Sequence, residues 1–146
     1  MQIKELTYIN HITGWNVRNM NINKLTLLVG ASGVGKTQIL KSILSLAKVA
    51  NGRSLNGVEW CIEFTIDKNQ YEWRGCFDQL DSIETNLFTD RIVVPIAFES
   101  LKINDLVFVH REGSKIIYRD EETIKLDSNK SVVALLKEEQ DVAPIY

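Results

Sequence analysis

The sequence is poor in cysteine and proline, and it has no long apolar run. It contains two cysteines and two prolines among 146 residues. Cys61 and Cys76 match neither a disulfide framework nor the C-x₂-C spacing of a metal site. No stretch approaches the ~20 apolar residues that a membrane-spanning helix needs, and residues 1–5 lack the apolar segment of a signal peptide. We therefore expect a cytoplasmic protein that does not enter a membrane.

Charge of one sign is also lacking. Lys and Arg number 17 against 19 Asp and Glu, a formal net charge of −2. No global basic field would draw the protein to nucleic acid or to an anionic membrane. The composition, 45% hydrophobic and 25% charged, is that of an ordinary globular domain. We see no internal repeat and no low-complexity segment, so one core is expected.

The first third of the chain has the pattern of an α/β unit. Residues 3–8 are predicted to form a short strand. Residues 25–29 are an unbroken apolar run, typical of a strand buried on both faces of a parallel sheet. In residues 36–50 the apolar side chains recur at helical spacing, and Asn51-Gly52 follows as a stop signal. The pattern predicts strand, loop and helix in that order.

Beyond the helix the apolar period changes from helical spacing to two. Residues 58–66 alternate, and the alternation resumes after Lys68-Asn69, which predicts an antiparallel hairpin. A turn at that point would set Phe64 opposite Trp73 and Cys61 opposite Cys76, both cysteines remaining thiols. Further elements are predicted in the rest of the chain: a strand at 92–98, whose Pro95 suits an edge or a strand end, a hairpin of 106–110 with 115–119, its extension at 123–126 and an amphipathic helix at 131–140.

One motif carries recognisable chemistry. Gly30-Ala31-Ser32-Gly33-Val34-Gly35-Lys36-Thr37 fits the P-loop (Walker A) pattern G-x-x-x-x-G-K-[ST] at every fixed position. The motif also leaves a predicted strand and opens a predicted helix, whose N-terminus offers free N–H groups to phosphate. A glycine-rich turn that only caps the helix would need neither three glycines nor Gly-Lys-Thr. We expect these eight residues to bind a purine nucleoside triphosphate, ATP with Mg²⁺.

Each part of this motif has a physical task. The three glycines let successive backbone N–H groups approach the phosphates. Lys36 supplies a mobile positive charge to the β- and γ-phosphates, and the Thr37 hydroxyl is the predicted ligand of Mg²⁺. Trp15, ahead of the motif, could stack on adenine, although a buried role in the core is commoner for tryptophan.

Catalytic groups are less evident. A hydrolytic P-loop enzyme usually has an apolar strand that ends in Asp, and no such segment is present. The nearest run, residues 92–99, is broken by Pro95 and ends in Glu99, for which we expect a structural role. His11 and His110 have no partner that the sequence places beside them, so we expect ordinary surface or strand-end residues.

The segment from Leu25 through Thr37, with Gln38-Ile39-Leu40 opening the helix, resembles the start of ABC-class ATPases. The alternating segments 59–78 and 105–126 resemble the antiparallel lobe of the soluble branch, which includes SMC-like repair proteins, OLD-type ATPases and anti-phage defence ATPases. The resemblance implies an α/β P-loop NTPase core with an antiparallel β lobe, an incomplete ABC-type ATPase head. It divides residues 1–146 into a P-loop unit (1–52), a β lobe (53–126) and a terminal helix (127–146).

The same resemblance carries expectations about activity. In that family the Walker B strand, the signature motif and the switch histidine come later, so we expect the N-terminal part of a longer ATPase (a hydrolase), which binds ATP and hydrolyses it poorly alone. The family implies a homodimer with ATP between the subunits, gating an effector such as a nuclease or acting on nucleic acid, in DNA repair or antiviral defence. Gln140 is the candidate for the glutamine that contacts Mg²⁺.

Two other classes of function stay open at this point. A small P-loop kinase would move the γ-phosphate of ATP to a metabolite, but it should carry an arginine-rich lid where this chain has alternating strands. A non-catalytic ATP-sensing module would be completed by a partner chain. Turnover assays with and without that partner would distinguish the three.

Overall fold

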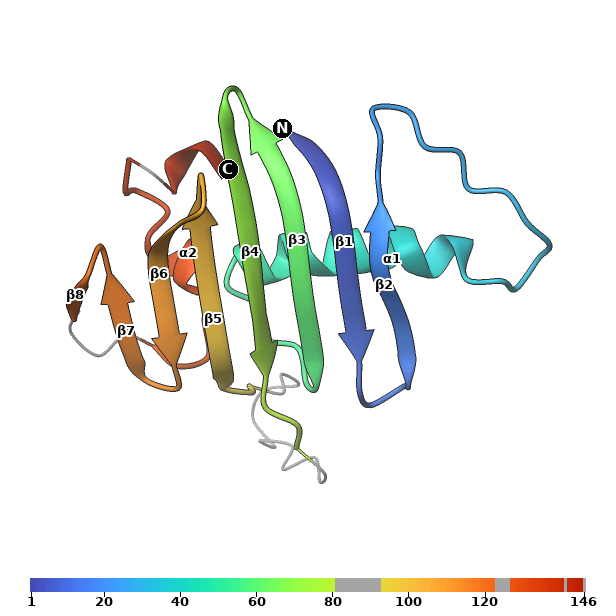
Figure 1. Ribbon diagram of the computed structural model, residues 1–146. Helices are drawn as coiled ribbons and strands as arrows, with labels where there is room; N and C mark the ends of the chain where they lie inside the picture. The colour runs from blue at the N-terminus through green and yellow to red at the C-terminus, as the bar shows by residue number, and fades with distance from the viewer. Residues whose placement is uncertain (81–92, 123–126, 141, 146) are drawn as a thin grey trace.

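One antiparallel sheet dominates the computed structural model, which describes residues 1–80, 93–122, 127–140 and 142–145. Its order is β2-β1-β3-β4-β5-β6-β7-β8, and every described pair of neighbouring strands is antiparallel (Figure 1). The strands are β1 (Gln2–Asn10), β2 (Trp15–Asn21), β3 (Val58–Ile66), β4 (Asn69–Phe77), β5 (Ile96–Ile103), β6 (Leu106–Glu112), β7 (Lys115–Tyr118) and β8 (Glu121–Glu122).

Helices cover one face of this sheet. The helix α1 (Lys36–Ala50) runs across the strands behind β2, β1, β3 and β4 (Figure 1). The short α2 (Val132–Leu135) and the 3₁₀ turn η1 (Ala143–Ile145) lie farther along the sheet, toward β5 and β6 (Figure 1). The predicted helix at 36–50 is confirmed with both bounds. The helix predicted at 131–140 is reduced to one turn, α2, with Ser131 as its N-cap.

The core lies between α1 and the sheet. Alternation of apolar and polar side chains along β3 and β4 is confirmed, because one face is buried and the other is partly exposed. Aromatic rings fill the buried face: Trp60 lies 5.3 Å from Trp73 and 5.4 Å from Phe77, centroid to centroid, and Phe64 stacks on Tyr71 at 5.1 Å. Such rings bury a large apolar area and form the surface on which α1 packs.

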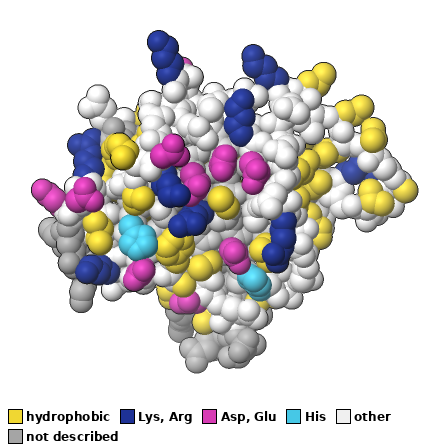
Figure 2. Space-filling model, in the orientation of Figure 1, with side chains coloured by type: hydrophobic (Ala, Val, Ile, Leu, Met, Phe, Trp, Pro, Cys, Tyr) yellow, Lys and Arg dark blue, Asp and Glu magenta, His cyan; other side chains and the backbone are white. Residues whose placement is uncertain are grey.

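The opposite face of the sheet is open and charged. Figure 2 views this face, where Lys and Arg side chains are interspersed with Asp and Glu. Lys102 Nζ lies 2.9 Å from a Glu72 carboxylate oxygen, and Arg74 Nε lies 3.7 Å from the same oxygen. A mixed, solvated face is ordinary for an antiparallel sheet that packs a helix on one side only.

The predicted fold class, an α/β P-loop NTPase core, is wrong. Residues 25–29 form no strand, and the side chains of Leu25, Leu27 and Val29 are 90%, 81% and 77% exposed. They belong to the long loop that projects beyond β2 in Figure 1. Both edges of β1 are already paired, with β2 and with β3, so no position beside β1 is open to this segment. The incomplete ABC-type head is replaced by a meander-like antiparallel sheet with one long helix.

The predicted register of the first hairpin is also wrong. The turn is Asp67-Lys68, one residue earlier than predicted, with Ile66 paired to Asn69. Asp67 has φ 54°, and Asp tolerates this left-handed conformation better than most residues. The pairing shifts by two residues, so the faces are unchanged but Phe64 opposes Tyr71.

This shift separates the two cysteines. Cys61 pairs with Arg74, and Cys76 pairs with Glu59. Both side chains are on the open face of the sheet, half-buried, and both are free thiols. Burial, followed by the nearby Glu72 carboxylate, raises the pKa of Cys61 to about 11. The thiols therefore stay protonated near neutral pH, as small packing side chains.

The remaining strands agree with the prediction in kind but differ in their bounds. Strand β5 begins at Ile96, directly after Pro95, rather than at residue 92. It lies between β4 and β6 rather than at an edge of the sheet, so Pro95 is tolerated because it precedes the strand. The hairpin of β6 and β7 is confirmed at Leu106–Glu112 and Lys115–Tyr118. The predicted extension at 123–126 lies outside the described residues. Strand β2 was not predicted, since its polar sequence gives no apolar alternation.

Candidate functional site

The motif at residues 30–37 forms the end of the loop and the first turn of α1. Gly33 and Gly35 have φ values of 87° and 95°, a left-handed region that side chains rarely adopt. Gly35 is the N-cap of α1, and the amides of Gln38 and Ile39 donate to its carbonyl. No side chain caps this helix and no acidic residue lies in its first turn. The helix N-terminus, with its partial positive charge, is thus open to an anion.

The Lys36 side chain folds back onto the loop that precedes α1. Its Nζ donates to the carbonyl oxygen of Gly30 at 2.6 Å and to that of Ala31 at 2.5 Å. A Cβ added to Gly30 would lie 3.0 Å from a Val34 methyl group and 4.0 Å from the Lys36 ammonium. The ammonium is therefore held at the mouth of a tight backbone turn. Thr37 follows on the first turn, with its side chain exposed.

Trp15 lies beside this turn, although the sequence separates it widely from the motif. Its indole Nε1 is 3.6 Å from the position that a Cβ on Gly35 would occupy. The ring is half-buried, and its centroid is 6.0 Å from that of Tyr8 on β1. Since β2 begins at Trp15, the edge of the sheet and the N-terminus of α1 meet at this aromatic side chain.

Glu99 is the carboxylate that the sequence analysis singled out. It lies on β5, away from the motif, and is fully buried. It accepts hydrogen bonds from Trp73 Nε1 at 2.8 Å, Ser131 Oγ at 2.5 Å and the Val132 amide at 2.8 Å. Burial raises the pKa of Glu99 above its ordinary value, opposed by these donors and by the Arg111 guanidinium 4.0 Å away. All these contacts are structural ones, so Glu99 is not a free base beside the motif.

Arg111 completes this buried cluster and was not found from the sequence. Its guanidinium donates to the carbonyls of Gly113, Lys130 and Asp127 at 2.7, 2.6 and 2.7 Å. Arg111 on β6 is paired directly with Glu99 on β5. The two charges together hold the segment around Ser131 against the sheet. A signal was present in the sequence, because both residues fall in phase with the apolar positions of their strands.

The structure does not bring the remaining candidates to the motif. His11 Nε2 lies 3.0 Å from Glu59, and His110 Nε2 lies 3.2 Å from Glu112, both pairs at the surface. Gln140 follows α2 in the chain, and α2 lies on the opposite side of the molecule from the projecting loop (Figure 1). Among the described residues, no group of three or more His, Cys, Asp and Glu side chains could hold a metal ion.

Comparison with known proteins identifies a distant relative. The chain is 24% identical over 151 aligned residues to the probable ABC transporter ATP-binding protein p29 of Mesomycoplasma hyorhinis. The alignment covers 100% of this chain and 56% of the relative, so the chain spans little more than half of that protein's length. No protein-family model matches the chain, and no solved structure does. The similarity supports a relationship to ABC-class ATP-binding proteins and no finer subdivision.

Within the described residues, every helix is too short or too polar to span a lipid bilayer.

Proposed function

We propose that residues 30–37 bind the phosphates of ATP together with Mg²⁺. The observation that carries this proposal is the Lys36 ammonium held on the Gly30 and Ala31 carbonyls, in a glycine turn that opens directly onto the N-terminus of α1. Phosphate oxygens are stronger acceptors for an ammonium than neutral carbonyls. A triphosphate entering the turn would take over Lys36 and meet the free amides of the first helical turn.

The side chains around the turn supply the other contacts in this proposal. The Thr37 hydroxyl, exposed on the first turn, would be one ligand of Mg²⁺, which keeps most of its remaining sites for phosphate oxygens and water. Trp15 is adjacent to Gly35 and would stack on the adenine, since an aromatic face accepts any nucleobase. The similarity to a probable ATP-binding protein of an ABC transporter favours ATP over other phosphate ligands.

The wider role is a hypothesis that rests on the sequence resemblance. Under it, nucleotide binding promotes a homodimer and gates an effector nuclease or a nucleic-acid partner, in DNA repair or antiviral defence. The described residues contain no feature that identifies such a partner. Because the chain spans 56% of the relative's length, the activity of a whole protein of that kind is part of the proposal too.

ATP binding is tested by calorimetry with and without Mg²⁺. Wild-type protein should bind ATP more tightly with Mg²⁺ than in EDTA, and Thr37→Ala should lose most of this difference, about ten-fold in affinity, because one metal ligand is removed. Thr65→Ala, on the open face of the sheet, is the matched control and should behave as wild type. Absence of ATP binding, or the same Mg²⁺ dependence in Thr37→Ala, would contradict the proposal.

ATP turnover by this chain should be close to zero. Hydrolysis needs a carboxylate to orient water or hold Mg²⁺, and the one that the sequence offered, Glu99, is enclosed by its structural donors. A coupled phosphate-release assay over hours is the measurement. Brisk release that disappears in Thr37→Ala would show that a catalytic carboxylate has been missed. Transfer of the phosphate to an added metabolite instead of water would favour the kinase alternative.

A further inference from the structure

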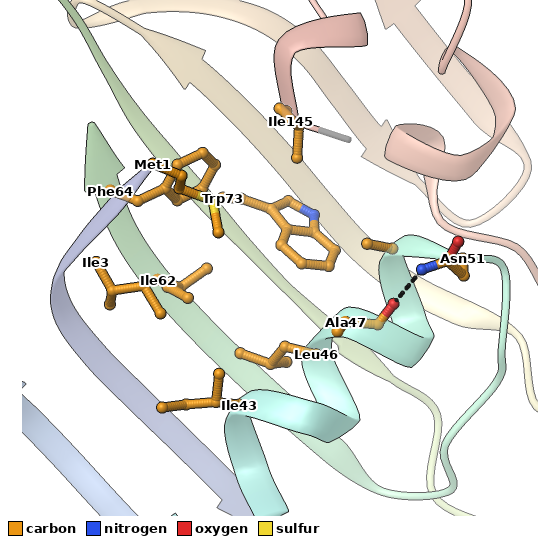
Figure 3. Close-up of a pocket in the computed structure, with 11 residues that line it drawn as sticks. Met1, Ile3, Ile43, Leu46, Ala47, Asn51, Ile62, Phe64, Trp73 and Ile145 are labelled. Atoms are coloured by element: carbon orange, nitrogen blue, oxygen red, sulfur yellow. Dashed lines mark hydrogen bonds between the residues drawn. The ribbon is translucent and has the colours of Figure 1, made fainter. Parts of the chain in front are cut away.

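A hollow of about 200 Å³ lies between α1 and the sheet, on the buried face, away from the motif. Figure 3 shows that its lining comes from α1, β1, β3 and β4 and from η1, with the side chains directed toward one another across the space. Eleven residues line it: Met1, Ile3, Ile43, Leu46, Ala47, Ala50, Asn51, Ile62, Phe64, Trp73 and Ile145.

The hollow is deep on one side and open on the other. Its floor consists of core residues, since Leu46, Phe64 and Trp73 are only 2%, 2% and 4% exposed. At its mouth, Met1 and Ala47 are exposed to solvent. A small molecule could therefore enter from solvent and reach the aromatic core without unfolding an element.

The lining is almost purely apolar. Among the described lining residues, Asn51 has the one polar side chain apart from the Trp73 indole, and its Nδ2 already donates to the Ala47 carbonyl at 2.7 Å. Trp73 Nε1 is bonded to Glu99. No charged side chain of the described residues lines the space, so an ion would lose its hydration there without compensation from a side chain. Apolar cavities of about 150 Å³ stay dry and accept benzene.

From this geometry we infer a binding site for a small apolar molecule, a single aromatic ring or a short alkyl chain. The volume admits one ring but excludes a helix or a strand, whose diameter with side chains is about 10 Å. Filling the hollow removes apolar lining from water and restores dispersion contacts that an empty space lacks. The site does not depend on nucleotide binding, because none of its lining residues belongs to residues 30–37.

Fluorobenzene, followed by ¹⁹F NMR, is the probe for the intact chain. Saturable binding is expected with a dissociation constant of about 0.1–1 mM, the range open to a ligand of so few atoms. Binding should also raise the melting temperature, because a ligand at free concentration c stabilises the folded chain by RT ln(1 + c/Kd). A probe signal that stays unchanged, or that grows linearly up to the solubility limit, would overturn the assignment.

Variants at the mouth locate the site. Ala47→Leu places three more carbons in the hollow. Because these carbons occupy space that the ring would fill, the variant should weaken fluorobenzene binding at least about ten-fold. Lys48→Leu adds the same side chain one position along α1, outside the lining, and should change binding less than about two-fold. Circular dichroism confirms that both variants are folded, and Ala47→Met serves in place of an unfolded Ala47→Leu.

Two further results would refute the small-molecule site. If sedimentation shows a dimer that Ala47→Leu dissociates, while fluorobenzene neither binds nor shifts the equilibrium, a second copy of the chain fills the space and the small-molecule site is refuted. Equal binding by Ala47→Leu and wild type would place the probe elsewhere on the protein and would refute it as well.

Discussion

Glu99→Ala is expected to lower the free energy of unfolding by about 3–5 kcal/mol, the usual cost of removing one partner of a buried ion pair. The variant leaves the Arg111 guanidinium without its counter-charge and the Trp73, Ser131 and Val132 donors without their acceptor. Urea denaturation followed by tryptophan fluorescence measures the loss. Glu112→Ala is the matched control, because its carboxylate is 75% exposed, and it should change stability by no more than about 0.5 kcal/mol.

The same carboxyl predicts a pH dependence. Burial raises the pKa of Glu99 in the folded protein above its unfolded value of about 4.3. A raised folded pKa contributes stability that is complete below the unfolded pKa and is lost as pH rises through the folded pKa. Glu99→Gln cannot ionise, so the stability advantage of wild type over this variant should shrink from pH 4 toward pH 7. An advantage that grows with pH would mean that the donors and Arg111 outweigh burial.

Lys36→Ala is expected to weaken ATP binding about ten- to a hundred-fold, or roughly 1.5–3 kcal/mol, the value of one charge-assisted contact. Among the described residues, the Lys36 ammonium hydrogen-bonds only the Gly30 and Ala31 carbonyls, both within its own loop. The variant should therefore keep its melting temperature within a few degrees while it loses affinity. Calorimetry with ATP and Mg²⁺ gives the affinity.

Lys41→Ala provides the charge-matched comparison. Lys41 is exposed on the same helix, outside the motif, and its loss removes the same formal charge. If Lys36→Ala and Lys41→Ala weaken ATP binding equally, the effect comes from the general field of the helix and the P-loop assignment is wrong. If only Lys36→Ala does, the loop contact is responsible.

Local patterns predicted individual elements better than their assembly. Helix α1 was predicted with both bounds because a helical period ends at Asn51-Gly52, two signals that agree. The alternation in β3 and β4 predicted correctly which face is buried, but the predicted pairing register differs from the observed one by two residues. Period two is insensitive to such a slip, and only the left-handed Asp67 turn decides it.

The larger error concerns residues 25–29 and the assembly of the sheet. Apolar composition reports a tendency to be buried, but it does not report whether a partner strand is available. Strand β2, polar and Asn-rich, occupies the edge of β1 because pairing there is made by backbone groups rather than by side-chain pattern. The motif at 30–37 could be recognised from spacing alone, whereas the approach of Trp15 to Gly35 depends on β2 and could not be.

The order of the sheet has a consequence for how the chain assembles. From β3 to β8 every strand pairs with its neighbour in sequence, and these pairings close short turns except between β4 and β5, which residues 78–95 connect. The pairing of β1 with β3 is different, because Asn10 meets Val58 and everything between them must be closed into one loop. Loop-closure entropy grows with length, and non-local pairings are slow. Docking of the β1–β2 hairpin on β3 is therefore the expected slow step of folding, and the segment that must be closed for it includes residues 30–37.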